Sequence, residues 1–186
     1  GVRLHKEFAS QLPEQTGVDI EFRPRPALSL LFSDDEVAAA KGSLPWKQSQ
    51  ANYTVDLLDA QQSREVEPRI SLKTISAVYV EGTYDVDPYR LVLALTQAAE
   101  GMGAVVRHGT VAGLESSNGA VKAVNLEKGR IACDKVVLAM GPWSAEASGW
   151  LGVPIEVSPL KGQILRLRVP GPPFSVSVGY DSDYTT

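Results

Sequence analysis

Hydrophobic residues at the start of the chain follow first a helical and then a strand pattern. Large apolar residues stand four positions apart within residues 2–15, which predicts a helix that is ended by Pro13 and Gly17. The next two runs, VDIEFRP and ALSLLFS, are short and apolar and are separated by Pro24–Pro26. They predict two strands joined as a hairpin around the prolines.

Polar residues then mark the ends of further elements. Ser33, followed by three acidic residues, predicts the N-cap and first turn of a helix that runs toward Gly42. Residues 43–54 carry the weakest pattern in this half of the chain. Beyond them, DAQQSREVE predicts a short helix that stops at Pro68, and the alternation in ISAVYVEG predicts a strand.

The second half of the chain has clearer boundaries. Asp87 and Pro88 are a good N-cap and first residue of a helix. Its apolar residues are expected along one face: Leu91, Leu95, Ala98 and Met102. We expect AVVRHGTVAGLES to form one strand or a bent pair. Asn118-Gly119 predicts a hairpin turn into VKAVNLEKG, and Lys128-Gly129 turns the chain again into RIACDKVVLAM.

The stretch DKVVLAMGPWSAEA, residues 134–147, contains a candidate ligand site. VVLAM does not alternate, so we expect a strand buried on both faces, as in a parallel sheet covered by helices. Gly141 follows at the carboxyl end of this strand, where open α/β sheets bind ligands and a missing side chain lets a ligand approach the backbone. Ser144 is expected to cap the short helix that follows. The alternative is an ordinary turn at Gly141-Pro142 with Trp143 in the core.

Composition limits the class of protein. The 186 residues, 44% hydrophobic and 22% charged, are typical of a globular protein that buries a core. A formal net charge of −4 and dispersed basic residues argue against a nucleic-acid partner. No apolar run is long enough for a membrane span, and one cysteine fits a reducing compartment, so we expect a cytoplasmic protein. The histidines and the cysteine are not clustered, and no metal site is predicted.

Several motifs occur in a distinctive order, most specifically between Tyr84 and Leu167. They are VDPYRLVLALTQAAEGMGA, a strand with Val111, the Asn-Gly hairpin, DKVVLAMGPWS and VSPLKGQILRL. In this order and spacing the chain resembles the D-amino-acid oxidase family of flavoproteins. That family includes glycine oxidase, sarcosine oxidase and dimethylglycine dehydrogenase-like enzymes.

The resemblance implies FAD as cofactor and an α+β fold in two parts. One part is an antiparallel substrate-binding sheet with flanking helices, assigned to residues 17–80 and 153–186. The other is the middle of a FAD-binding α/β domain, with a helix, a β-meander and a parallel strand, assigned to residues 1–16 and 84–150. The family's GxGxxG loop and its later FAD-binding segment have no match. We therefore expect an internal fragment of a larger enzyme, inactive by itself, whose open sheet edge a homodimer partner would cover.

Four residues match family positions beside the cofactor. The resemblance implies that the backbone of Val111 lies along the adenine half of FAD, and the alternative is an ordinary core valine. Ala139, Gly141 and Trp143 match a small–x–Gly–x–Trp turn that runs beside the ribityl chain and the isoalloxazine ring.

Two tyrosines match the substrate side of the family's site. PLKGQ, residues 159–163, looks like the entry to the last strands of the substrate domain, from which the family extends a tyrosine toward the substrate carboxylate. Tyr184 is nearer to that position, and Tyr180 lies on the same edge. A phenol can donate to a carboxylate while its ring bounds an apolar pocket. The alternative is an ordinary strand aromatic in each case.

The function implied by the resemblance is oxidation of the C–N bond of a small amino acid or of a secondary or tertiary amine. A hydride moves to the flavin, and no acid–base residue is obligatory, so no catalytic residue is assigned. Two alternatives stay open. One is a non-catalytic α+β module that binds a small ligand or a protein. The other is a flavoenzyme of the glycerol-3-phosphate dehydrogenase type, which a basic phosphate-binding cluster would favour.

Overall fold

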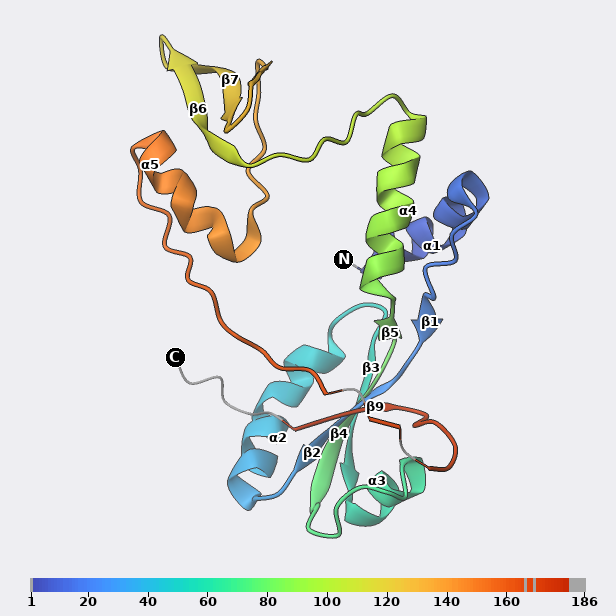
Figure 1. Cartoon of the computed structure of the whole chain (residues 1–186). Helices are drawn as coiled ribbons and strands as arrows, with labels where there is room; N and C mark the ends of the chain where they lie inside the picture. Colours follow the sequence, from blue (N-terminus) through green and yellow to red (C-terminus); the bar gives the residue numbers. More distant parts are fainter. Residues whose placement is uncertain (1, 166, 169, 181–186) are drawn as a thin grey trace. The chain divides into compact units, whose positions relative to one another are not determined.

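The computed structural model describes residues 2–165, 167–168 and 170–180 and divides into two compact units (Figure 1). The first unit contains the residues up to Val105 and those from Pro170 onward, and the second is Val106–Val169. Helices and mostly antiparallel strands occur together, which confirms the predicted α+β class. Packing alone does not define a functional domain, so the division into substrate-binding and FAD-binding domains stays a prediction. Among the described residues, no helix has the length and hydrophobicity to cross a bilayer.

Two helices of the first unit pack against each other through an apolar core. They are α1 (Val2–Thr16) and α4 (Pro88–Gly101). The core contains the buried residues Leu12, Ile20 and Ala94. The Asp87 carboxylate accepts a hydrogen bond from the Arg90 amide at 2.8 Å, which confirms the predicted N-cap of α4.

The sequence reading of these helices was wrong in two details. Helix α1 runs through Pro13 to Thr16. Gly17 follows it, with φ of +73°, and its N–H donates to the Pro13 carbonyl at 2.8 Å. Packing against α4 supports the helix and outweighs the single hydrogen bond that proline removes. Leu95 on α4 and Met102 directly after it are exposed, because the face of α4 that packs on the core contains Leu91, Ala94 and Ala98.

The centre of the first unit is a four-stranded sheet. Its order is β3 (Thr54–Asp59), β4 (Ser76–Glu81), β2 (Ala27–Leu31) and β9 (Ser177–Tyr180). Strand β4 is antiparallel to both β3 and β2, and β9 is parallel to β2. The predicted strand in ISAVYVEG is thus confirmed as β4. The sheet is antiparallel, as predicted, except at its edge pair of β2 and β9.

Both faces of this sheet are covered. Helix α2 (Asp34–Gln48) packs on the face that contains Leu31 and Val78, and α3 (Ala60–Val66) lies toward the face that contains Leu28 and Ala77. Ser33 caps α2 as predicted, in a capping box with Glu36. Helix α2 continues past Gly42 to Gln48, because its apolar side chains pack on the sheet.

The predicted hairpin around Pro24–Pro26 is wrong. Strand β1 (Arg23–Pro24) pairs with β5 (Tyr84–Asp85), whereas β2 pairs with β4 and β9. The Phe22 and Tyr84 rings stack with their centroids 4.5 Å apart beside the β1–β5 pair. A contact between segments so distant in the chain has no local signal, and the strand pattern alone could not reveal it.

The second unit contains a three-stranded antiparallel meander. Its strands are β6 (Val111–Ser117), β7 (Ala120–Leu126) and β8 (Arg130–Ala132). Asn118 and Gly119 have φ of 52° and 75° in the turn between β6 and β7, which confirms the predicted hairpin. Residues 104–110 form no strand. The meander is followed by the 3₁₀ helix η1 (Gly141–Ala147) and by α5 (Ser148–Leu151).

The predicted buried strand before Gly141 is not found. Residues 134–140 have no strand assignment, and the Val137 side chain is 91% exposed. A strand needs a hydrogen-bonded neighbour, and none of the described strands pairs with this segment. An apolar run indicates a tendency to be buried, but it does not show which strand would pair with it.

Candidate functional site

The turn after Met140 is open to solvent. Gly141 begins η1 with φ of +54°, and a Cβ added there would meet no atom within 4 Å. The Trp143 side chain is 63% exposed, and its backbone N–H donates to the Met140 carbonyl at 3.2 Å. The alternative that Trp143 is a core residue is therefore wrong. The turn has an uncovered backbone and an accessible aromatic ring, which leave room for a flat ligand to approach.

Ser144 does not have its predicted role. It lies inside η1, and its hydroxyl donates back to the Gly141 carbonyl at 2.7 Å. No side chain caps η1. The serine thus closes the turn from within and fixes the orientation of the Gly141 peptide group.

The segment after the Gly141 turn packs against the meander. Ala147 at the end of η1 is fully buried. The Trp150 side chain comes within 3.8 Å of the point where Gly113 of β6 would carry a Cβ, so a larger residue at 113 would press on this ring. Ser148 accepts a hydrogen bond from the Ile155 amide at 2.9 Å. These contacts make η1, α5 and β6 one packed group.

Two further candidates for the cofactor side lie in the same unit. Val111 is the first residue of β6 and is 38% exposed, and the pairing of β6 with β7 shifts between Val111 and Gly113. A β-bulge of this kind frees backbone groups and redirects side chains. Ala139 is exposed, two residues before Gly141. The predicted contact of each residue with FAD stays a prediction.

Tyr180 is the last residue of β9, next to Leu30 of β2. Its hydroxyl donates to Glu36 Oε1 at 3.1 Å, and its ring meets the Phe32 ring edge-on with centroids 5.1 Å apart. The side chain is 56% exposed. Tyr184, the second substrate-binding candidate, lies outside the described residues.

Glu36 is a residue that the sequence reading assigned only to a helix terminus. Its Oε2 accepts hydrogen bonds from the Phe32 amide at 2.5 Å and the Ser33 amide at 3.0 Å. These amides, the Phe32 amide first, together with the Tyr180 hydroxyl hold the pKa of Glu36 below its usual value of 4.5. Glu36 is therefore an anion at neutral pH. The sequence analysis predicted Ser33 as N-cap but not the contacts of Glu36. The spacing of Ser33 and Glu36 is that of a capping box and could have indicated the amide contact, whereas nothing local indicates the contact with Tyr180.

A cavity of about 790 Å³ lies between α2 and the β2–β9 edge of the sheet. Its polar lining includes Ser29, Glu36, Ser43, Lys47 and Tyr180. The volume is in the range of small-molecule sites. Carboxylate, ammonium, hydroxyl and phenol groups around one cavity suit a small ligand with charges of both signs.

Comparison with known proteins supports a common origin with flavoenzymes. A family model described as FAD dependent oxidoreductase matches residues 2–185. The glycine oxidase of Geobacillus kaustophilus is 26% identical over 176 residues, which are 94% of this chain and 46% of that protein. The bifunctional protein ThiO/ThiG of Synechocystis sp. is 30% identical over 165 residues, 88% of this chain and 23% of that protein.

A solved structure shows that the resemblance extends to the fold. The crystal structure of glycine oxidase from Geobacillus kaustophilus superimposes with a TM-score of 0.88 at 26% identity. The match covers 96% of this chain and 48% of that structure. The chain thus spans less than half the length of these relatives.

Proposed function

The chain belongs to the DAO family of FAD-dependent oxidoreductases, and from this membership we propose that the whole protein oxidises the C–N bond of a small amino acid or amine. Glycine oxidases are among its relatives in sequence and structure. The chemistry expected of the protein is removal of a hydride from the carbon that carries the amine, followed by hydrolysis of the resulting imine by water.

The observation that carries this proposal is the open turn at Gly141. FAD has a flat ring and a polar chain, and it fits a surface where backbone is bare and an indole is accessible. Gly141 has that space, because a Cβ there would contact nothing within 4 Å, and Trp143 is exposed beside it. In the proposal Ala139, Gly141 and Trp143 hold the flavin end of the cofactor, and Val111 holds the adenine end.

The cavity beside Tyr180 supports the substrate part of the proposal. An amino acid at neutral pH carries an ammonium and a carboxylate group, and Glu36 and Lys47 in the cavity lining carry the opposite charges. The lowered pKa of Glu36 keeps its carboxylate ionised. Tyr180 bounds the cavity with its ring, and its hydroxyl is oriented by Glu36. The contact of Tyr184 with substrate is proposed from the family motif alone.

Bound FAD would supply the two-electron acceptor, which no amino-acid side chain provides. The contribution of the chain is to hold the cofactor and to orient the substrate. The turn after Met140 presents backbone and indole to the cofactor, and the cavity groups orient the amine and the carboxylate. The substrate ammonium would lose a proton to water before the hydride leaves the adjacent carbon, so no acid–base side chain is obligatory, which agrees with the lack of an assigned catalytic residue.

The test is to purify the whole protein and measure bound flavin by its visible absorbance. Apoprotein is then titrated with FAD, and oxidation is assayed with glycine, N-methylated amines and larger amino acids, with glycerol 3-phosphate as the contrasting substrate. We expect stoichiometric FAD and oxidation of at least one amine. A colourless protein that binds no added FAD would refute the proposal and favour a non-catalytic binding module. Oxidation of glycerol 3-phosphate but of no amine would show that the substrate is a glycerol phosphate and not an amine or amino acid. Homodimerisation and a cytoplasmic location stay predictions.

A further inference from the structure

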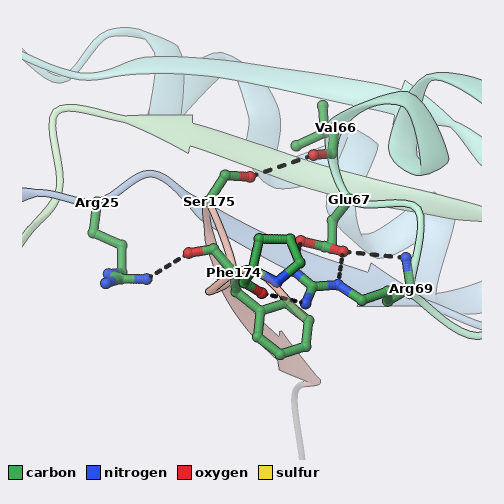
Figure 2. Close-up of polar contacts among 7 residues, drawn as sticks. Arg25, Val66, Glu67, Arg69, Phe174 and Ser175 are labelled. Atoms are coloured by element: carbon green, nitrogen blue, oxygen red, sulfur yellow. Dashed lines mark hydrogen bonds and ion pairs between the residues drawn. The ribbon is translucent and has the colours of Figure 1, made fainter. Parts of the chain in front are cut away.

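A cluster of charged and aromatic side chains joins the end of α3 to the segment before β9 (Figure 2). Glu67 follows α3 and is only 2% exposed. Its carboxylate receives two hydrogen bonds from the Arg69 guanidinium, from Nε at 2.7 Å and from Nη2 at 2.9 Å. The Arg69 amide also donates to Glu67, at 3.1 Å. The pair is thus bidentate, and its acid is buried.

The same guanidinium holds a part of the chain that is distant in sequence. Arg69 Nη1 donates to the Pro172 carbonyl at 2.7 Å, and the Arg69 guanidinium carbon lies 3.8 Å from the centre of the Phe174 ring. Figure 2 shows Arg69 beside Phe174, with Arg25 reaching the Phe174 carbonyl, a contact of 3.0 Å. The Ser175 hydroxyl lies 3.5 Å from the Val66 carbonyl. The segment 172–175 is therefore held by both α3 and the β1–β2 connection.

This anchored segment leads directly into β9. Val176 is 4% exposed in the core with Leu28 and Ile70. The Ser177 amide then donates to the Pro26 carbonyl at 2.8 Å. From there β9 runs parallel to β2, and Tyr180 is paired with Leu30.

Burial within β9 contributes little to its register, although Tyr180 at its end contacts Glu36 and Phe32. All four of its residues are exposed, so burial does not select which side chains face the sheet. A slip of one residue would move Tyr180 by about 3.3 Å and turn it to the opposite face. The residues that precede the strand therefore contribute to its register, through the buried Val176 and the Ser177–Pro26 hydrogen bond. Before these, Arg69 holds Pro172 and Phe174.

We propose that Glu67 and Arg69 are positioning residues that set the register of β9 on β2 and thereby hold Tyr180 at the cavity. The part of this inference that concerns substrate rests on the proposed function. Neither residue touches the cavity. They act at a distance along the chain, because Arg69 contacts the Pro172 carbonyl and the Phe174 ring, which precede the buried Val176 and β9.

The first test is amide hydrogen exchange of residues 177–180 in the whole protein, compared between wild type and Arg69→Met. We expect exchange to be at least about tenfold faster in the variant, because the strand loses its anchor. Arg130→Met is the matched control. Arg130 also makes a bidentate pair, with Glu115 at 2.8 and 2.9 Å, but this pair lies on the meander and both of its side chains are exposed. Unchanged exchange of 177–180 in Arg69→Met would overturn the inference.

The second test separates positioning from simple loss of a buried ion pair. Arg69→Met leaves the Glu67 charge buried and unpaired, whereas Glu67→Gln with Arg69→Met removes that charge. We expect the double variant to recover thermal stability while its β9 amides still exchange fast. Recovery of wild-type exchange in the double variant would show that the charges act only on stability, and would overturn the inference.

Kinetics test the link to Tyr180. We expect Arg69→Met to raise KM for the amine substrate about tenfold at unchanged FAD content, and to have no further effect in a Tyr180→Ala background. If Arg69→Met raised KM equally in the wild-type and Tyr180→Ala backgrounds, the inference that Arg69 acts through Tyr180 would be overturned. If the wild-type protein oxidises no amine, the proposed function fails, whereas hydrogen exchange still decides the role of the pair in the register of β9.

Discussion

Replacement of Gly141 by alanine tests the cofactor side of the site, because the free chain has room for the new methyl group. A Cβ at this position would meet no atom within 4 Å, so the substitution introduces no clash in the protein itself. What remains is the backbone conformation. Gly141 has φ of +54°, in the left-handed region that alanine adopts at a cost.

The cost of that backbone conformation determines how much stability Gly141→Ala loses. An L-residue in the left-handed region is less stable by about 1–2 kcal/mol, and no packing cost is added here. Gly152 provides a matched control in the same unit, since its φ is +70° and its added Cβ also meets nothing within 4 Å. Gly141→Ala and Gly152→Ala should therefore lower stability by similar amounts. If FAD lies on the Gly141 backbone, the methyl group at 141 also displaces the cofactor, and we expect the FAD Kd to rise at least about tenfold, or about 1.4 kcal/mol.

The assay has two measurements on each variant of the whole protein. Thermal unfolding of the apoprotein gives the backbone cost, and titration with FAD, followed by flavin fluorescence, gives the dissociation constant. The expected result is equal loss of stability in the two variants and weaker FAD binding in Gly141→Ala alone. Equal FAD affinity in Gly141→Ala and Gly152→Ala would refute the placement of the flavin against this turn.

Two further predictions concern the first unit. Glu36 has a folded-state pKa below 4.5, mainly because of the Phe32 amide, so its stabilising effect is present above that pH and is lost as pH falls through the folded pKa. Unfolding temperatures measured between about pH 7 and pH 3 should fall less steeply for Glu36→Gln than for wild type, and parallel curves would contradict the assignment. Gly82→Ala should destabilise more than Gly17→Ala, by about 1–3 kcal/mol, because both have positive φ but only the Cβ at 82 would clash with the Asn52 carbonyl. Equal unfolding temperatures for the two variants would contradict the close approach at Gly82.

The elements with local signals could be predicted well. Asp87 and Pro88 mark the start of α4, and Asn118-Gly119 forms the expected hairpin turn. Ser33 caps α2 as predicted. In each case the interaction joins residues a few positions apart, so the sequence contains both partners. Most errors came where a pattern needed a distant partner, as for the hairpin at Pro24–Pro26. The predicted cap at Ser144 is a local error, because this residue lies inside η1.

Some residues of the candidate site could likewise be predicted from the sequence, and others could not. The glycine and tryptophan of the turn after Met140 could be selected from the sequence, and the resemblance to flavoproteins pointed to them. The contact of Tyr180 with Glu36, which are 144 positions apart, could not. The same is true of Arg69 and Pro172, which are 103 positions apart. No periodicity or cap relates such residues, because the strand order of the sheet brings them together.

The sequence by itself determined the caps and turns, since these depend on side-chain chemistry within a few residues. The order and spacing of its motifs also determined the family resemblance, and through it the α+β class. Only the tertiary structure decided which strands pair, that Val137 is exposed and that Glu36 reaches Tyr180. The physical reason is that strand pairing and burial are shared between segments. The sequence of one segment indicates whether it tends to form a strand or to be buried, but the segment against which it packs is determined by the whole fold.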